Sequence, residues 1–197
     1  MRKLTDSVRT VEKLKQALFS CLNEKSYADI TITEIAKRAG INRTTFYLFF
    51  ESKDELCMQL CGALVDRWFQ LFFDLNINKS HVAGNADMEK ALFGELLSWI
   101  RQWRPALKRI SNVRTASFDG FTQFTEEFEK RMAAQSIFQT EDEMKRKKYS
   151  LFIKMYALGL AATMKWWFDE GEGFEAKEFH EMIERLRYKG YYSILND

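Results

Sequence analysis

The sequence contains few of the residues that end helices and form turns. It has one proline and nine glycines in 197 residues. Sheet proteins of this size need many turns, and turns use glycine and proline often. Long helices joined by few loops fit this composition better than a sheet does. We therefore predict an all-α fold of about nine helices.

Other absences limit the class of protein. The longest nearly apolar run, Met155 to Met164, lies between two lysines and is half of the roughly 20 residues that a membrane span needs. The N-terminal sequence MRKLTDSVRT lacks the apolar core of a signal peptide. Three cysteines are too few and too clustered for a disulfide framework. These features predict a cytoplasmic protein with no membrane partner.

Charge is distributed unevenly along the chain. Residues 1–50 hold nine basic and five acidic side chains, a net charge of +4. Residues 51–197 hold 21 basic and 23 acidic side chains, a net charge of −2. A basic first quarter followed by a slightly acidic remainder indicates a polyanionic partner for the N-terminal part.

Hydrophobic residues recur at helical spacing along most of the chain. Residues 76–87 are polar and contain glycine, which is typical of a loop. We place a domain boundary between residues 52 and 53, which gives an N-terminal domain (1–52) and a C-terminal helical domain (53–197). The predicted helices cover residues 9–24, 32–39, 42–50, 53–75, 88–102, 105–113, 117–134, 141–169 and 175–195.

Residues 31–50 have the plan of a helix-turn-helix. Thr31 and Glu34 form the Thr-x-x-Glu pattern of a capping box at the start of the first helix. Gly40 suits the left-handed residue that ends a helix, and Asn42 suits the cap of the next one. Such a motif lays its second helix in the major groove of DNA.

The start of that second helix carries groups that can read bases. Arg43 can donate two parallel hydrogen bonds to guanine. Thr44 and Thr45 can bond bases or phosphates through their hydroxyls and touch the thymine methyl through their own methyls. The segment therefore predicts double-stranded DNA as a partner.

The string TITEIAKRAGINRTTFYLFFESKDEL resembles the N-terminal DNA-binding domain of the TetR family of transcriptional regulators. The shared features include Ala39-Gly40-Ile41, Thr45-Phe46-Tyr47 and Ser52-Lys53, and the resemblance extends over about residues 8–68. It implies an N-terminal three-helix DNA-binding domain followed by a C-terminal helical domain that binds a ligand and dimerises.

The resemblance also implies roles for single residues. Thr31 and Tyr47 match phosphate contacts, and Lys53 matches a lysine that binds the DNA backbone. Thr33 matches a position that reaches a base in some members. The base-reading positions match Arg43, Thr44 and Thr45.

Two residues depart from the family pattern. Phe49 stands where His or Tyr often contacts phosphate, and Phe cannot donate a hydrogen bond. Leu48 stands where a polar or larger aromatic residue is common. These departures predict that the contact with the DNA phosphate backbone is weaker or has a different geometry. They also support an alternative, a helical ligand-binding or protein-interaction module with degraded DNA binding.

Aromatic side chains at helical spacing follow in the C-terminal part. Such stripes are typical of a buried core, and they can also line a ligand cavity between helices. The sequence leaves both interpretations open, and it names no effector. The candidate cavity residues are Trp68, Phe72, Trp99, Trp103, Phe121, Phe124, Tyr156 and Trp167.

Small residues in the segment 155–168, among them Ala157, Gly159, Ala161 and Ala162, allow close helix approach. In the family, the last two helices pair across a two-fold axis, so the resemblance implies a homodimer with two reading heads on a palindromic operator. Residues 159–179 resemble a subgroup that includes a regulator of dihydroxyacetone kinase genes. A member of the family can repress or activate; we predict a ligand-responsive repressor, with an activator as the alternative.

No enzyme motif and no metal motif stands out. Cys57 and Cys61 are four residues apart, but His81 and His180 lie far away in sequence, and a structural metal site usually needs four ligands. We interpret the cysteines as buried thiols. A nucleophile elbow, a P-loop, GxGxxG and HExxH do not occur. We therefore expect no enzyme activity, no metal and no cofactor.

Overall fold

The computed structural model describes residues 2–76 and 86–171, together with positions 173, 175, 178, 181 and 182. Every regular element in these residues is a helix, and they contain no strand. The elements are α1 (Arg2–Glu24), α2 (Ile32–Ala39), α3 (Arg43–Phe46), α4 (Lys53–Asn76), α6 (Ala86–Ser111), α7 (Gly120–Ala133), the short 3-10 helix η1 (Ser136–Phe138) and α8 (Glu143–Asp169). The all-α prediction is confirmed.

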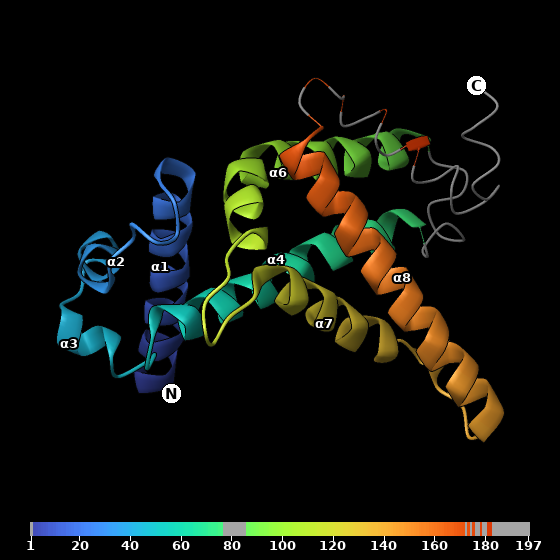
Figure 1. Ribbon diagram of the computed structural model, residues 1–197, viewed down its shortest axis with the longest axis horizontal. Coiled ribbons are helices and arrows are strands. Elements are labelled where there is room, and N and C mark those ends of the chain that lie inside the picture. Colours follow the sequence, from blue (N-terminus) through green and yellow to red (C-terminus); the bar gives the residue numbers. More distant parts are fainter. Residues whose placement is uncertain are drawn as a thin grey trace.

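The helices form two groups that meet along α4 (Figure 1). Helices α1, α2 and α3 form an N-terminal head, in which α2 packs on both α1 and α3. Helices α4, α6, α7 and α8 form a bundle, in which α7 packs between α4 and α8. Helix α4 also packs against α1, so it carries the head at its first turns and the bundle along the rest of its length.

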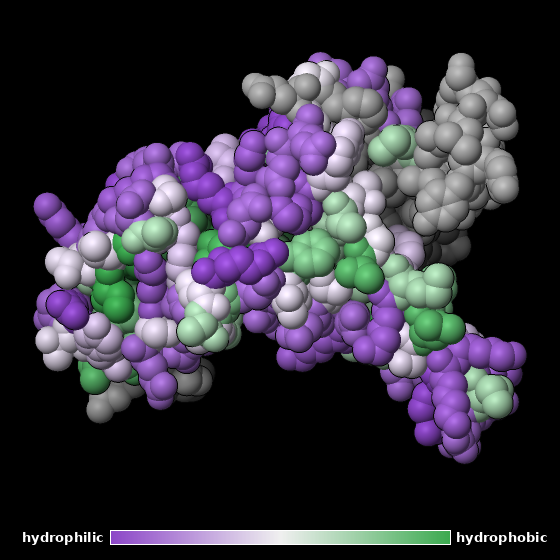
Figure 2. All heavy atoms as spheres, viewed as in Figure 1, coloured by the Kyte–Doolittle hydropathy of each residue, from purple (hydrophilic) through white to green (hydrophobic). Residues whose placement is uncertain are grey.

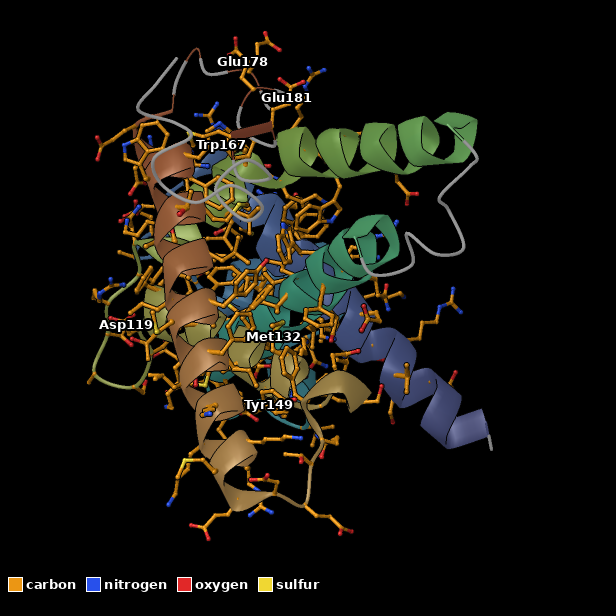
Figure 3. The ribbon with its side chains drawn as sticks, turned by 90° about the vertical axis from the view of Figure 1, so that its right-hand side faces the viewer. Asp119, Met132, Tyr149, Trp167, Glu178 and Glu181 are labelled. Atoms are coloured by element: carbon orange, nitrogen blue, oxygen red, sulfur yellow. The ribbon has the colours of Figure 1, made fainter. Side chains whose placement is uncertain are left out.

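Buried apolar faces hold each group together. In the head, Leu14, Leu18 and Ile35 are fully buried, and Phe46 and Phe50 pack ring against ring with centroids 5.8 Å apart. In the bundle, the ring of Phe128 lies 4.8 Å from that of Trp68 and 5.6 Å from that of Phe69. Figure 3 shows side chains filling the space between α4, α7 and α8, with Met132 of α7 near its centre.

Helix α6 corrects one prediction. The sequence suggested two helices, 88–102 and 105–113, whereas the structure has one helix that contains Pro105. Proline removes one backbone hydrogen bond and pushes on the preceding turn, which kinks a helix without always ending it. Figure 1 shows α6 bending along its length. Burial of Ala106, Leu107 and Ile110 keeps the second part helical.

Other elements also differ from the predictions. Helix α1 begins at Arg2 instead of residue 9. Helix α3 spans four residues instead of the predicted range 42–50. Tighter i→i+3 hydrogen bonds, such as Phe49 N–H to Phe46 C=O at 3.0 Å, continue the turn to Phe50. Helix α7 begins at Gly120 instead of residue 117, because the side chain of Asp119 caps it. The sequence analysis missed η1. The loop at 76–87 and the final predicted helix at 175–195 lie almost wholly outside the described residues.

In the parts of the chain that the structure describes, no helix has both the length and the apolar character needed to cross a bilayer.

Candidate nucleic-acid interface

The turn between α2 and α3 is built from three local devices. The hydroxyl of Thr31 accepts a hydrogen bond from the Glu34 N–H at 3.2 Å and so caps α2. Gly40 ends α2 in the left-handed conformation, with φ 72° and ψ 30°, which glycine adopts without steric cost. Asn42 caps α3, because its side-chain oxygen accepts from the Thr45 N–H at 2.7 Å. All three predicted roles are confirmed.

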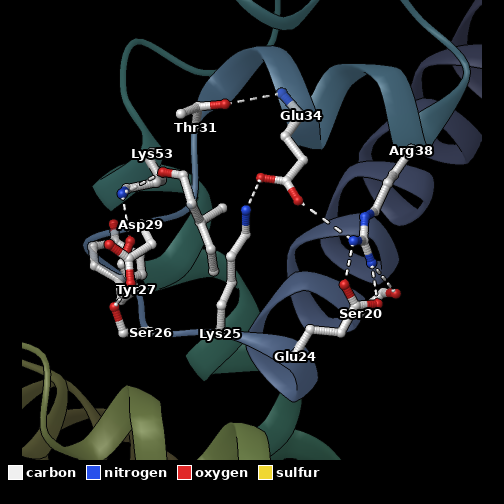
Figure 4. Close-up of polar contacts among 11 residues, drawn as sticks. Ser20, Glu24, Lys25, Ser26, Tyr27, Asp29, Thr31, Glu34, Arg38 and Lys53 are labelled. Atoms are coloured by element: carbon white, nitrogen blue, oxygen red, sulfur yellow. Dashed lines mark hydrogen bonds and ion pairs between the residues drawn. The ribbon is translucent and has the colours of Figure 1, made fainter.

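A charged network fixes α2 on α1 (Figure 4). The Arg38 guanidinium donates to the carboxylate of Glu24 and, at 2.8 Å, to the Ser20 hydroxyl. Glu34 accepts from Lys25 at 2.6 Å. The hydrogen bond from Arg38 lowers the pKa of Glu24, and that from Lys25 lowers the pKa of Glu34. The network lies on the surface and sets the angle between two helices whose apolar faces do most of the packing.

The predicted base-reading residues gather on one exposed surface. Thr33, Arg43 and Thr44 are exposed, and Thr45 is half-buried. A shallow groove between α2 and α3 brings Thr33, Arg43 and Thr45 together with Lys37. The sequence analysis did not single out Lys37, although its position four residues after Thr33 puts both on one face of α2.

Two of these side chains are held by neighbours. The Arg43 guanidinium donates to the Tyr47 hydroxyl at 3.2 Å and lies 5.7 Å from the centre of its ring. This contact ties a predicted base reader to a predicted phosphate contact. The Thr45 hydroxyl donates to the Asn42 side-chain oxygen at 2.9 Å. With its proton used in this bond, the hydroxyl can only accept from a donor group of a base, and the methyl group stays available for apolar contact.

Lys53 has partners inside the protein. Its ammonium group donates to the backbone carbonyls of Tyr27 and Ile30, both at 2.7 Å, and lies 4.1 Å from the centre of the Tyr27 ring. Partial burial lowers the pKa of Lys53. These two bonds use two of the three N–H donors of its ammonium group. Its predicted phosphate contact stays a prediction, and Lys53 also ties the α1–α2 loop to the start of α4.

The two departures from the family pattern have different surroundings. Leu48 is among the most exposed apolar side chains, at 77%, so it adds little to the core of the head. Phe49 is half-buried and packs against that core. Phe49 therefore has a structural role that a polar side chain would fill less well.

Asp54, at the start of α4, joins the head to the bundle. It accepts hydrogen bonds from the hydroxyls of Tyr27 in the head at 2.5 Å, and of Thr115 and Ser117 in the α6–α7 loop at 2.7 and 2.5 Å. A second link runs from Arg109 of α6 to the backbone carbonyl of Leu22 at 2.6 Å. We call Asp54 and its three hydroxyl donors, Tyr27, Thr115 and Ser117, the Asp54 junction.

The junction gives a pH-dependent prediction. Partial burial raises the pKa of Asp54, but the three hydroxyl donors and the positive charge of Lys53 together outweigh burial and lower it. A lowered folded-state pKa stabilises the protein above the unfolded pKa of about 4, and this contribution is lost as the pH falls through the folded pKa. We expect Asp54→Asn to lower the free energy of unfolding at pH 7 by ~1–3 kcal/mol and to flatten its fall between about pH 5 and pH 3.

Urea unfolding at fixed protein concentration, at pH 7 and in steps down to pH 3, measures both effects. Glu126→Gln, which neutralises an exposed carboxylate on α7, is the matched control and should follow the wild type closely. An Asp54→Asn curve parallel to that of the wild type would show that the junction carboxylate does not contribute to the pH dependence.

The bundle contains a small apolar cavity of about 70 Å³. Four of the predicted cavity residues, Trp68, Trp99, Phe121 and Phe124, line it. Its polar lining comes from Ser111 and Lys165, which the sequence analysis did not single out. Helices α4, α6, α7 and α8 all contribute to its wall.

The structure places three other candidates elsewhere. Trp103 stacks on Phe19 of the head, with ring centroids 3.7 Å apart. Tyr156 stacks on Phe152, and Trp167 lies under the Arg104 guanidinium near the end of α8. The side chain of Phe72 lies outside the described residues. Helical spacing identified the aromatic stripes, but it does not tell which face of a helix meets a cavity.

The three cysteines are buried thiols, as predicted. Burial raises the pKa of Cys21 and, more strongly, that of Cys61, which keeps both thiols protonated and unreactive at neutral pH. In the described residues, no group of three or more His, Cys, Asp or Glu side chains is arranged to hold a metal ion.

Comparison with known proteins shows which sequences resemble this chain. Residues 16–60 match the family described as bacterial regulatory proteins, tetR family. The chain is 41% identical over 46 residues to the HTH-type transcriptional regulator EthR of Mycolicibacterium smegmatis, covering 23% of this chain and 21% of EthR. It is 39% identical over 64 residues to the uncharacterized HTH-type regulator YxbF of Bacillus subtilis, covering 30% and 17%. The chain thus spans about a fifth of the length of these curated relatives.

A solved structure extends the likeness beyond the head. The crystal structure of a TetR transcriptional regulator from Rhodococcus sp. RHA1 superposes with a TM-score of 0.52 at 15% sequence identity. The match covers 89% of this chain and 91% of that one, so the two proteins share a fold over nearly their whole lengths. Residues 16–60 of this chain are thus similar to the tetR family of bacterial regulatory proteins, and its fold as a whole resembles that of a TetR regulator.

Proposed function

We propose that this protein is a transcriptional regulator that binds a palindromic operator as a homodimer, with α3 in the major groove. One observation carries the proposal: Arg43, Thr44 and Tyr47 are exposed together on a helix-turn-helix whose angles are fixed by caps and a buried core. Arg43 and the threonines would read bases. Thr31, Tyr47, Lys37 and Lys53 would contact phosphates.

The domain boundary at residues 52 and 53 belongs to this proposal. Residues 1–52 would form the reading head, and residues 53–197 would bind the ligand and dimerise. Because α4 contacts both groups, we treat its first turns as the part that transmits movement. Binding to bacterial DNA would place the protein in the cytoplasm.

Selection from random-sequence duplex DNA on the purified protein, over a series of salt concentrations, tests the proposal. We expect an enriched palindrome and an affinity that falls steeply with salt, because phosphate contacts release counterions. Weak retention without enrichment would contradict it. That result would favour the alternative, a helical module with degraded DNA binding, which the exposed Leu48 and the half-buried Phe49 make worth testing.

Arg43→Ala should weaken binding to the selected operator by ~1–3 kcal/mol and relax the base preference at one position of each half-site. The reason is the loss of a guanidinium that Tyr47 already holds in place. Fluorescence anisotropy on the operator and on a set of single-base variants measures affinity and preference. Arg101→Gln removes the same charge from an exposed site on α6, and it should leave the base preference unchanged. An Arg43→Ala profile that keeps every base preference would exclude Arg43 as a base reader.

The dimer would form through α8. Its outer face carries exposed apolar side chains, among them Leu151 at 61%, Met155 at 68% and Leu158 at 53%, with Gly159 and Ala162 also exposed on the helix. Figure 2 shows hydrophobic residues among hydrophilic ones on the projecting part of α8. A row of large exposed apolar side chains is typical of a protein–protein interface. The final predicted helix, 175–195, would pair beside α8 in the family's four-helix arrangement.

A small-molecule effector would bind in the apolar cavity of the bundle. At about 70 Å³ the cavity is smaller than the ~300–1,000 Å³ of typical ligand sites. An effector would therefore widen it by moving the aromatic side chains and the helices that carry them. Leu107 and Ser111 line the cavity on α6, close in sequence to Arg109 and to the loop of the Asp54 junction.

This placement suggests how a ligand would act. Movement of α6 would displace Arg109 relative to α1 and the α6–α7 loop relative to Asp54. The head would then move, and the distance between the heads of the two protomers would change. A ligand shifts that equilibrium by its differential affinity for the two arrangements. We propose a repressor that the effector releases from DNA, with an activator as the alternative direction, and no catalytic activity. The resemblance of residues 159–179 to the dihydroxyacetone kinase regulator subgroup stays a prediction.

A further inference from the structure

A second and much larger cavity lies between the head and the bundle. This groove has a volume of about 890 Å³, against about 70 Å³ for the apolar cavity. Its walls come from the α1–α2 loop, the first residues of α4, the second part of α6, the α6–α7 loop and the end of α8. Figure 2 shows a largely hydrophilic surface over the middle of the molecule.

The groove is strongly basic. Five of its side chains are cationic and two, Asp54 and Asp169, are carboxylates, a net charge of +3 in one groove. The whole chain, with 30 basic and 28 acidic residues, has a net charge of only +2. The five cations are Lys53, Arg104, Lys108, Arg109 and Arg114.

Most of these charges meet backbone carbonyls. Arg104 donates to the Trp167 carbonyl at 3.0 Å, Lys108 to the Asp169 carbonyl at 3.2 Å, and Arg109 to the Leu22 carbonyl. These carbonyls lie in the last turns of α8 and α1, where helix ends favour cations. A carbonyl satisfies a donor but carries no net charge, so the positive potential remains. Among the described residues, only Arg114 of the five has a carboxylate within ion-pair distance, that of Asp119.

The two carboxylates in the groove accept hydrogen bonds from groups other than its five cations. Asp54 accepts from the three hydroxyls of the Asp54 junction. Asp169 accepts from Lys165 and, at 2.8 Å, from Asn112. Both carboxylates keep their negative charge, which the net charge of +3 already counts, but neither forms an ion pair with the four cations that bind carbonyls. An arginine has five N–H donors and a lysine has three, so donors remain on Arg104 and Lys108 after the contacts above.

From this arrangement we infer a second ligand site: the groove binds a small anion that carries two or more negative charges, a phosphate-bearing or polycarboxylate metabolite. The anion would be held by Arg104 and Lys108 of α6 and by Lys53, the first residue of α4, which is bonded to the α1–α2 loop of the head. Because the ligand would bridge head and bundle, it would favour one angle between them. This site is distinct from the apolar cavity, and its existence does not depend on DNA binding by the head.

Isothermal titration of the full chain at low salt tests the site, with inorganic pyrophosphate and citrate as separate probes. We expect saturable binding of one pyrophosphate per chain. The double variant Arg104→Gln/Lys108→Gln should weaken it at least ~10-fold, since two ligating charges are lost. Arg101→Gln/Lys130→Gln removes two charges from exposed positions outside the groove and should change affinity less than ~2-fold. If citrate and pyrophosphate bind with equal affinity, the groove recognises negative charge alone. If pyrophosphate binds more tightly, the groove recognises phosphate groups.

Several results would overturn the inference. Equal affinity in all three proteins would show no site in the groove, and an equal loss in both double variants would show a general charge effect. Displacement of pyrophosphate by non-operator duplex DNA would assign the groove to the DNA backbone instead. Because Arg104 also caps α8, the single variant Lys108→Gln, which changes one exposed side chain, must show a smaller loss of the same sign. An unchanged affinity in a folded Lys108→Gln protein would also contradict the site.

Discussion

Gly120→Ala is expected to destabilise the protein by about 3 kcal/mol or more. A Cβ atom at this position would lie 1.8 Å from the backbone carbonyl oxygen of Ile110, a distance that no rotamer change can relieve. The obstacle is the end of α6, where Ile110 itself is fully buried. Gly120 also donates its N–H to the Val113 carbonyl at 3.1 Å, so the clash would open the α6–α7 loop.

The effect should reach beyond α7, because the same loop carries Thr115 and Ser117 of the Asp54 junction. At roughly 2–4 °C per kcal/mol for a chain of this size, the melting temperature should fall by about 6–12 °C. Circular dichroism melting at fixed protein concentration measures the change. If the α6–α7 loop carries the junction, operator binding should become weaker as well.

Gly62→Ala is the matched control, since Gly62 also lies in a buried helical position. The nearest atoms to its added Cβ belong to the side chains of Arg131 and Glu127, at 3.6 Å and beyond, which is ordinary contact. Alanine favours a helix over glycine by up to about 1 kcal/mol, so this variant should melt at the same or a higher temperature. Equal melting of both variants would show that the close packing of Gly120 on Ile110 does not limit stability.

The local structure of the head could be predicted from sequence because its determinants are local. The capping pattern at Thr31, the left-handed Gly40 and the cap at Asn42 each depend on residues within one helical turn. Exposure of Arg43 and Thr44 follows from the same helix once Phe46 and Phe50 are assigned to the core.

Features that depend on residues far apart in the sequence could not be predicted from it. Two carbonyls in the α1–α2 loop bind Lys53, and no spacing rule in the sequence joins residue 53 to residues 27 and 30. Tertiary burial also decided that α6 passes through Pro105 instead of stopping before it. Likewise, four of the eight candidate aromatics line the apolar cavity because of helix orientation, which the stripes alone do not fix. The basic groove joins four segments that are separated in the sequence, and only the fold brings them together.

The dimer proposal predicts the largest effect on function. In the double variant Leu151→Glu/Leu158→Glu, two carboxylates replace apolar side chains that are 61% and 53% exposed in the single chain. Their burial across a two-fold axis would place like charges close together and desolvate them. We expect a monomer in sedimentation equilibrium. Operator affinity should fall by ~100-fold or more, because the second head no longer benefits from the binding of the first.

The fold of each chain should survive this change, since substitutions at exposed positions usually alter the free energy of unfolding by less than about 0.5 kcal/mol. Far-ultraviolet circular dichroism therefore separates loss of the dimer from loss of structure. The charge-matched control Arg101→Gln/Lys130→Gln lowers the net charge by the same two units without touching α8 and should remain dimeric. A Leu151→Glu/Leu158→Glu protein that stays dimeric and keeps its operator affinity would move the interface away from α8. The exposed apolar row would then need a different partner, because large apolar side chains in such numbers rarely face water without one.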